Sequence, residues 1–289
     1  MALVLGGCAG TGSDLRDAGR AHSDARSIPA SSHPAANETV RLPASISQAG
    51  MVIGHAPPGS TVRYAGRTLW LGPGGAFVFG VARDASGAAQ VQIVTPDGRS
   101  QTVEIRIVPH PWKIERVNGV PEGTVHPSPE IAARIEREQA SVALARERDD
   151  PREDFLVDFI APVNGRISGW FGSQRIYNGT PGAAHSGLDI AAPKGTPVQA
   201  PAAGIVIFAA PDLYLTGGTV VIDHGCGISS NFLHLSRIDV KVGDRVEQGQ
   251  VFAAVGATGR ATGPHMHWGV NWFETRLDPE LLLEHSAHR

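Results

Sequence analysis

The chain is poor in cysteine, in aromatic residues and in net charge. Its 289 residues include two cysteines, 6% aromatic residues and a formal net charge of −3. Two cysteines exclude a disulfide framework of several bridges, and the near-neutral balance gives no basic stripe for nucleic acid. We expect no nucleic-acid partner. No stretch after Cys8 reaches the roughly 18 apolar residues of a membrane-spanning helix.

The first eight residues, MALVLGGC, form a short apolar run that ends at a cysteine. Leu5, Gly6 and Gly7 before Cys8 resemble the end of a bacterial lipoprotein signal, in which the cysteine carries lipid after cleavage. The run lacks a basic start and is too short for a complete signal. Two interpretations stay open. Residues 1–8 are a truncated signal, which predicts a periplasmic chain anchored through Cys8, or the cysteine occurs there by chance.

Two further segments precede the middle of the chain. Residues 9–39 are rich in Ala, Ser, Gly, Pro and charge, so they predict a flexible tether. From residue 40, runs such as AFVFGVAR and AQVQIVT alternate between apolar and polar residues and are separated by Pro and Gly clusters. This pattern predicts a small antiparallel β domain over 40–126. It shows no cluster of catalytic residue types, and His55 is expected at the surface or in a turn.

A connecting helix is predicted over 127–151. Ser128 can cap it, Pro129 suits its first position, and the sequence DDP at 149–151 ends it. A modest apolar stripe comprises Ile131, Ile135, Val142 and Leu144. The stripe predicts a connector packed on one side, with a fully solvated linker helix as the alternative.

The pattern changes again in the last segment, 152–289. Short β-like runs are punctuated by glycine, and seven of the twelve histidines lie beyond residue 180. Five of these fall between His185 and His267. We expect the chemistry of the protein in this C-terminal β domain.

The stretch AAHSGLDIAAP contains the first candidate group. His185 and Asp189 are four residues apart, but Gly187 and Pro193 argue against a helix. A turn at Ser186 and Gly187 would instead bring the imidazole and the carboxylate together. One nitrogen and one oxygen ligand are an arrangement that zinc accepts.

The stretch GPHMHWGV contains the second candidate group. In a strand, residues i and i+2 point to the same face about 6.5 to 7 Å apart. His265 and His267 therefore share a face, while Met266 points to the other. This separation suits one metal ligand and one neighbour that handles protons.

The third candidate, His234, lies in NFLHLS between Leu233 and Leu235. Strand alternation predicts its imidazole on the face opposite both leucines. Together, the four imidazoles and one carboxylate can form a three-ligand metal site with an open position. An open position is typical of a catalytic zinc site.

The motifs HSGLD, HL after a β run and TGRATGPHMHW, in this order, closely resemble the LytM or lysostaphin family of zinc metallopeptidases. That family cleaves peptide bonds in bacterial peptidoglycan. The resemblance covers about residues 155–275, also includes GTPVQAPAAGIV and VKVGDRVEQGQ, and is highly specific because three separated motifs keep their order. It implies a mainly β chain whose C-terminal domain has an antiparallel fold, the duplicated hybrid motif, with the site in a groove between loops.

The resemblance also implies roles for individual residues. His185, Asp189 and His267 correspond to the zinc ligands. His234 and His265 correspond to the catalytic histidines, which activate water or stabilise the tetrahedral intermediate. The sequence does not divide these two tasks between them.

Three nearby residues need separate interpretation. Phe232 stands where the family often has a tyrosine, so the hydrogen bond of that hydroxyl is missing. Cys226, in a turn, is expected to be a small packed residue and not a catalytic thiol. For His224 a supporting or structural role is favoured over a direct one.

The segment SQRIYNG precedes the first motif and could line the groove through Arg175 and Asn178. The guanidinium of Arg175 would suit a substrate carboxylate. The alternative is a salt bridge within the loop.

We therefore expect a periplasmic zinc endopeptidase that hydrolyses peptide crosslinks of peptidoglycan, with D-alanyl to diaminopimelate bonds favoured over glycine bridges. The alternative is a non-catalytic LytM-like protein that binds the cell wall or activates other hydrolases. A biotinyl or lipoyl carrier is rejected because the last lysine, Lys241, lies too early for the hairpin tip. The N-terminal part is expected to position the enzyme, bind a cell-wall or division partner, or shade the groove.

Overall fold

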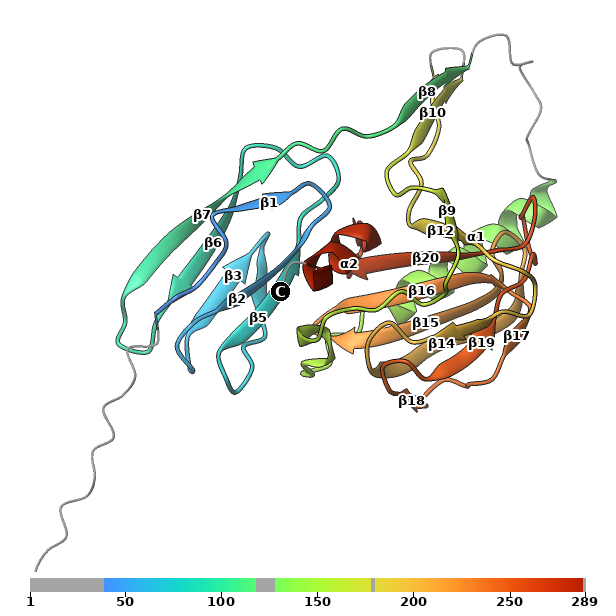
Figure 1. Cartoon of the computed structure of the whole chain (residues 1–289). Coiled ribbons are helices and arrows are strands. Elements are labelled where there is room, and N and C mark those ends of the chain that lie inside the picture. Colours follow the sequence, from blue (N-terminus) through green and yellow to red (C-terminus); the bar gives the residue numbers. More distant parts are fainter. Residues whose placement is uncertain (1–38, 118–127, 178–179, 288–289) are drawn as a thin grey trace, which may run out of the picture. The chain divides into compact units, whose positions relative to one another are not determined.

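Strands are the commonest regular structure in the described chain, which comprises residues 39–117, 128–177 and 180–287 of a computed structural model (Figure 1). The chain from Glu38 to Arg289 is one compact unit. No helix in the described ranges is long and apolar enough to cross a membrane. The predicted signal, Cys8 and nearly all of the predicted tether lie outside the described residues.

The N-terminal part contains eight strands: β1 (Ser45–Ser47), β2 (Met51–His55), β3 (Thr61–Tyr64), β4 (Arg67–Leu69), β5 (Ala76–Gly80), β6 (Ala88–Val94), β7 (Ser100–Val108) and β8 (Ile114–Val117). Five of them form a sheet in the order β1-β7-β6-β3-β4, and β2 pairs with β5. Residues of β6 alternate between exposed and buried along its whole length, as the period-2 pattern predicted. Two pairs depart from the antiparallel prediction, because β1 runs parallel to β7 and β8 runs parallel to a strand of the C-terminal part.

Helix α1 (Pro129–Ala145) begins at the predicted first position and ends before the DDP sequence at 149–151 that was predicted to end it. The Ser128 hydroxyl accepts the backbone N–H of Ile131 at 3.4 Å. The predicted apolar stripe is correct in part: Ile135 and Val142 are half-buried, whereas Leu144 is 66% exposed. No residue of α1 is buried, so its packing rests on few apolar contacts.

The C-terminal part contains β9 (Arg166–Gly169), β10 (Gln174–Tyr177), β11 (Thr180–Pro181), β12 (Leu188–Ala191), β13 (Pro197–Gln199), β14 (Gly204–Leu213), β15 (Gly217–Gly225), β16 (Ile228–Leu235), β17 (Arg237–Ile238), β18 (Arg245–Val246), β19 (Val251–Ala254), β20 (His265–Trp272) and β21 (Thr275–Leu277). A short 3-10 helix (Asp154–Leu156) precedes them and α2 (Pro279–Ala287) follows. The main sheet has the order β18-β14-β15-β16-β20-β12-β9, and β21 pairs with β20. The smaller sheet is β13-β19-β17.

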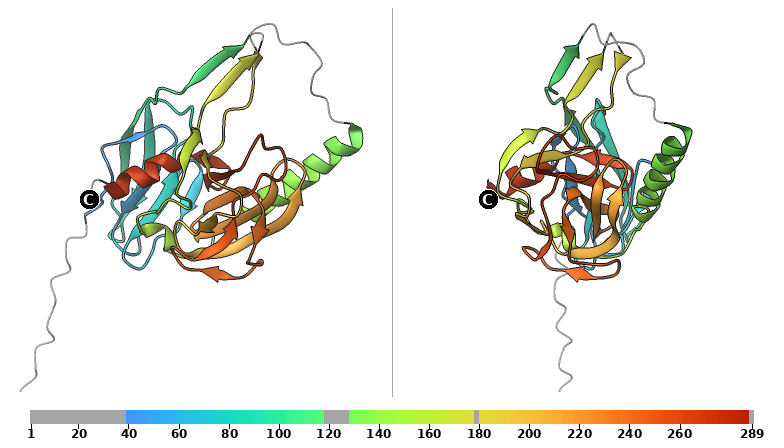
Figure 2. Two further views of the ribbon diagram at one scale, coloured as in Figure 1. Left: turned by 45° about the vertical axis from the view of Figure 1, so that its right-hand side comes forward. Right: turned by 90° about the vertical axis from the view of Figure 1, so that its right-hand side faces the viewer.

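Strand pairing and helix packing both link these strands to the preceding segments. Strand β8 pairs in parallel with β10, and β10 pairs with β11. Helix α1 packs beside β14, as the turned views show (Figure 2). There the guanidinium of Arg134 donates to the Asp212 carbonyl at 2.8 Å, and Glu138 accepts the backbone N–H of Tyr214 at 2.8 Å.

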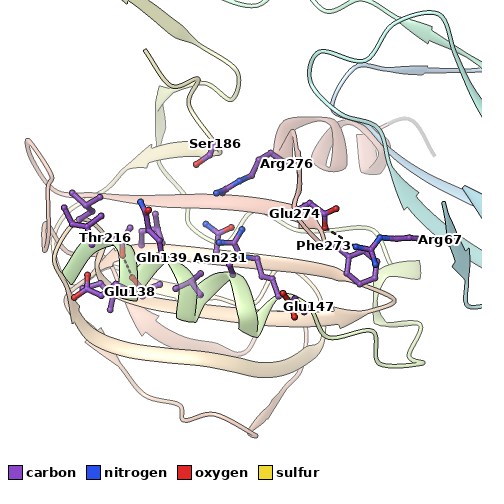
Figure 3. Close-up of a pocket in the computed structure, with 18 residues that line it drawn as sticks. Arg67, Glu138, Gln139, Glu147, Ser186, Thr216, Asn231, Phe273, Glu274 and Arg276 are labelled. Atoms are coloured by element: carbon purple, nitrogen blue, oxygen red, sulfur yellow. Dashed lines mark hydrogen bonds and ion pairs between the residues drawn. The ribbon is translucent and has the colours of Figure 1, made fainter. Parts of the chain in front are cut away.

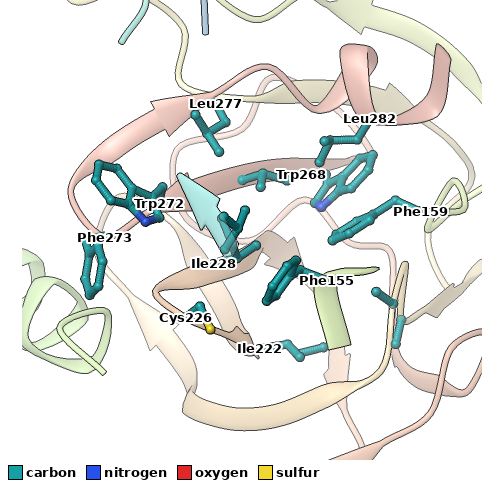
Figure 4. Close-up of a cluster of buried hydrophobic side chains, with 14 of the residues drawn as sticks. Phe155, Phe159, Ile222, Cys226, Ile228, Trp268, Trp272, Phe273, Leu277 and Leu282 are labelled. Carbon is teal, nitrogen blue, oxygen red and sulfur yellow. The ribbon is translucent and has the colours of Figure 1, made fainter. Parts of the chain in front are cut away.

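The core of the C-terminal domain lies on one face of the main sheet (Figure 4). Phe155, Ile222, Ile228 and Trp268 are fully buried there. Every residue of β15 is buried, since it lies between β14 and β16. This packing fixes the central strands and thus the residues on their opposite face.

Candidate metal centre and active site

The candidate ligands come from two paired strands and the turn before one of them. Strands β12 and β20 are antiparallel, with Asp189 opposite His267. Because directly opposite residues point to the same side of a sheet, their side chains meet. His267 Nδ1 lies 2.9 Å from Asp189 Oδ1. His185, in the preceding turn, places Nε2 3.2 Å from the same oxygen and 3.1 Å from His267 Nδ1.

These separations fit a metal ion. The ligand atoms of His185, Asp189 and His267 all lie within 4.8 Å of one another. Ligands about 2.0 to 2.1 Å from a tetrahedral zinc lie about 3.3 Å apart, close to the three distances above. The structure has a bend at Gly187 where a turn at Ser186 and Gly187 was predicted, and this bend makes the convergence possible.

Backbone carbonyls orient three of the imidazoles. Nδ1 of His185 lies 3.0 Å from the Trp170 carbonyl, Nδ1 of His234 lies 2.8 Å from that of Thr258, and Nδ1 of His265 lies 2.9 Å from that of Gly263. A carbonyl only accepts, so in each ring Nδ1 carries the proton. In the neutral form, each Nε2 is left with a free lone pair.

Electrostatics set the ionisation of the ligands. Burial opposes the charge of Asp189, but hydrogen bonds from His185 and His267 outweigh it and hold the pKa of that carboxyl well below its usual range. Burial also lowers the pKa of His267 to about 4. For His185, burial acts in the same direction, but the hydrogen bond and charge of Asp189 outweigh it and raise the pKa. An ionised carboxylate beside a neutral imidazole is the form that binds metals.

His234 and His265 form a second pair beside the ligand group. Their ring centroids are 4.7 Å apart, and His265 Nε2 lies 3.9 Å from Asp189 Oδ1. His265 shares the face of His267, and Met266 is fully buried on the other, as predicted. Burial lowers the pKa of His234.

The predicted alternation around His234 is wrong. His234 has φ +63°, a left-handed conformation that breaks the strand pattern. Leu235 is therefore buried in the core with Phe232, while Leu233 lines a cavity on the other side of the sheet. The two leucines thus do not share a face, and the break turns the imidazole toward His265.

Two glycines, Gly169 and Gly187, also make room for the ligands. A Cβ at Gly187 would lie 2.6 Å from His267 Nε2 and would also collide with the Trp268 carbonyl. A Cβ at Gly169 would collide with the Asp189 carboxylate. The glycine inside HSGLD could have indicated this role from the sequence, because a residue between two converging ligands has little space for a side chain.

The remaining candidates lie elsewhere. Arg175 is on β10, and its side chain, like all of Asn178, is outside the described part of the chain. Cys226 is buried, and burial raises the pKa of its thiol to about 12, which suits a packed residue. Phe232 is fully buried and packs against Phe252 at 4.8 Å between ring centroids.

His224 has a structural place. It is fully buried, with Nδ1 2.7 Å from the Ala203 carbonyl and Nε2 2.9 Å from the Ser230 hydroxyl. The ring of Phe159 packs edge-on against it. The structure therefore favours the structural interpretation of this residue.

Burial of His224 predicts a loss of stability in acid. Burial lowers its pKa from 6.5 to about 4, so the unfolded chain takes up this proton first as pH falls. The neutral, buried imidazole contributes about 3 kcal/mol to the free energy of unfolding. This contribution is complete above pH 6.5 and is lost as the pH falls from 6.5 to 4. In urea unfolding, His224→Gln should be less stable than the wild type at pH 7.5 but should lose about 2.5 kcal/mol less than the wild type between pH 7.5 and pH 4.5. Equal losses would contradict this assignment.

The sequence of this domain has named relatives. The description Peptidase family M23 matches residues 183–279. The chain is 43% identical over 104 residues to the Peptidoglycan DD-endopeptidase ShyA of Vibrio cholerae serotype O1, covering 36% of this chain and 24% of that protein. It is 34% identical over 131 residues to the Cell division protein DipM of Caulobacter vibrioides, covering 43% of this chain and 21% of that protein. The chain thus spans under a quarter of the length of these curated relatives.

A solved structure extends the likeness beyond this domain. A crystal structure of a protein from Pseudomonas aeruginosa, described as a peptidase M23, matches with a TM-score of 0.63 and 34% sequence identity. The match covers 82% of this chain and 94% of that one. The similarity therefore includes strands well before residue 183. On this likeness in sequence and fold, the chain belongs to Peptidase family M23.

Proposed function

We propose that this protein is a zinc-dependent endopeptidase that hydrolyses peptide crosslinks of peptidoglycan. The convergence of His185, Asp189 and His267, with two further histidines beside them, carries this proposal. The name of the Vibrio relative, a peptidoglycan DD-endopeptidase, supports the substrate class. The MALVLGGC stretch supports a periplasmic chain anchored through a lipid on Cys8.

His185, Asp189 and His267 would hold the metal through Nε2, a carboxylate oxygen and Nδ1. When bound, zinc polarises the scissile carbonyl and lowers the pKa of water toward 7. The two oxygens of Asp189 and the neutral imidazole of His267 need no proton loss at neutral pH to serve as ligands.

His234 and His265 supply the proton transfers. Their Nδ1–H groups are fixed on backbone carbonyls, so Nε2 of a neutral ring can take the proton of the attacking water. Once protonated, the same Nε2–H can donate to the leaving amine. The Nε2 of the second ring, when protonated, can donate to the oxyanion that develops on the substrate carbonyl.

Digestion of purified sacculi tests this function. Metal-loaded protein should convert crosslinked muropeptide dimers to monomers, with the glycan strands unchanged in length, and a chelator should stop the conversion. Mass analysis of the released fragments identifies the bond that is cut. Dimers left intact by protein that holds one zinc ion per chain would favour a non-catalytic wall-binding protein or an activator of other hydrolases.

A further inference from the structure

A cavity of about 1020 Å³ lies between helix α1 and the sheet face that bears the metal centre (Figure 3). In the β16–β20 pair, Leu233 is opposite His267 and Asn231 is opposite Gly269, so both point to the side of the ligands. Leu233 and Asn231 line the cavity on the side of the sheet, and Ile135 and Val142 line it on the side of α1. Its volume is at the upper end of the range of ligand pockets.

The cavity lies beside the metal centre, although its lining does not include the ligands. Ser186, the neighbour of His185, is part of its wall. Thr216 is another wall residue, and its carbonyl accepts the backbone N–H of His234 at 2.8 Å. A peptide that extends from the cavity past Ser186 would reach the reacting groups.

Polar groups in this cavity have no partner within the described residues. Asn231 is only 5% exposed, and its Oδ1 accepts no hydrogen bond there. The Nε of Arg146, just after α1, is likewise buried without an acceptor. A buried amide oxygen and a buried guanidinium N–H cost stability unless a partner arrives. A peptide N–H and a carboxylate would supply the two partners.

The cavity wall has more unpaired positive charges than unpaired negative ones among the described residues. Glu138 is held by Arg134 and the N–H of Tyr214, and Glu274 pairs with Arg67. Arg146 and Arg276 also line the wall, and neither belongs to an ion pair in the part of the chain that the structure describes. Burial and the charge of Arg276 lower the pKa of Arg146 to about 10. Two neighbouring cations face one remaining carboxylate, that of the exposed Glu147.

The strand register gives the distance between Arg276 and the metal centre. Arg276 of β21 is opposite Asn271, which is four residues along β20 from His267. At about 3.3 Å per residue, the separation is about 13 Å along the strand. A substrate group there would lie within about four residues of the bond that is cut.

We propose that Arg146 and Arg276 form a subsite for a carboxylate of the peptidoglycan peptide stem, with Asn231 bound to a peptide N–H between this subsite and the metal. Two guanidinium groups that form no ion pair within the described residues match a carboxylate, which accepts paired N–H donors. The inference rests on the proposed function, because it assumes that the peptide in the cavity is the substrate.

Binding of an uncrosslinked peptide stem tests the subsite, since metal-loaded protein has no crosslink to cut in it. The stem is prepared in two forms, the free acid and a form with its carboxylates amidated. The affinity of each form is measured for the wild type, for the double variant Arg146→Gln and Arg276→Gln, and for Arg148→Gln. Arg148 is a matched control, because it is partly exposed and already pairs with Asp150 at 2.6 Å. The wild type and the control should bind the free acid at least about tenfold tighter than the amide. The double variant should bind both forms with the affinity that the wild type has for the amide.

Equal binding of both forms by the wild type would overturn the subsite, and this comparison does not depend on any variant folding. A tenfold preference retained by a folded double variant with unchanged metal content would also overturn it. Cleavage of crosslinked dimers is scored separately. Cleavage of the dimers without a preference for the free acid would contradict the subsite but agree with the proposed function. A preference for the free acid without cleavage would contradict the proposed function.

Discussion

Replacing His265 by alanine should leave the metal bound and lower turnover by about 100- to 10,000-fold, the usual contribution of a general acid–base group. His265 Nε2 lies 3.9 Å from Asp189 Oδ1, farther than the corresponding atoms of His185 and His267. Its loss therefore removes a proton-transfer group and no ligand. Metal content by atomic absorption and the rate on a crosslinked dimer measure the two effects independently.

The ligand variants should behave differently. In His267→Ala and Asp189→Ala, metal and activity should disappear together, because each removes an atom of the converging group. Added zinc should restore little activity to either variant. Equal metal loss in His265→Ala and His267→Ala would contradict the division of roles proposed for the two histidines.

Replacing Gly187 by alanine should lower metal affinity by about 10- to 100-fold, as is typical when the support of a ligand is disturbed. The new methyl would lie 2.6 Å from His267 Nε2 and against the backbone carbonyl of Trp268. The carbonyl belongs to β20, which is paired on both sides, so it cannot move freely. The ring of His267 must shift instead. We also expect a loss of about 1 to 3 kcal/mol in unfolding free energy.

Gly74→Ala is the matched control for this change. A Cβ at Gly74 meets nothing within 4 Å, and its φ lies outside the left-handed region. This variant should stay within about 0.5 kcal/mol of the wild type and should keep its metal affinity. Metal affinity is measured by competition with a chelator of known affinity. Unchanged affinity in Gly187→Ala would show that the ring tolerates the methyl group.

Local pattern predicted much of the candidate site. The spacing of His265 and His267 placed both on one face of a strand, and the glycine and proline around Asp189 excluded a helix. Both conclusions need only the period of a strand and the conformational preferences of single residues. The resemblance then selected the same three ligand residues that the structure brings together.

The features that pattern missed depend on backbone conformation or on contacts between distant segments. The left-handed φ of His234 cannot be read from NFLHLS, because a histidine there normally continues the strand. Leu144 was assigned to the packed face of α1, but the helix ends just after it and the residue faces solvent. The approach of α1 to the metal-bearing face joins residues almost a hundred positions apart, such as Val142 and Leu233. The sequence alone therefore does not indicate that Arg146 lies near the metal-bearing face.

A zinc titration on one substrate tests the central claim most directly. Chelated protein is mixed with a defined crosslinked muropeptide dimer, and zinc is added in steps up to one equivalent. We predict no cleavage before zinc, and then a rate that rises in proportion to bound zinc and stops rising at one ion per chain. The product monomers should together weigh one water more than the dimer. Cleavage by the chelated protein, or an intact dimer at one bound zinc per chain, would contradict the account.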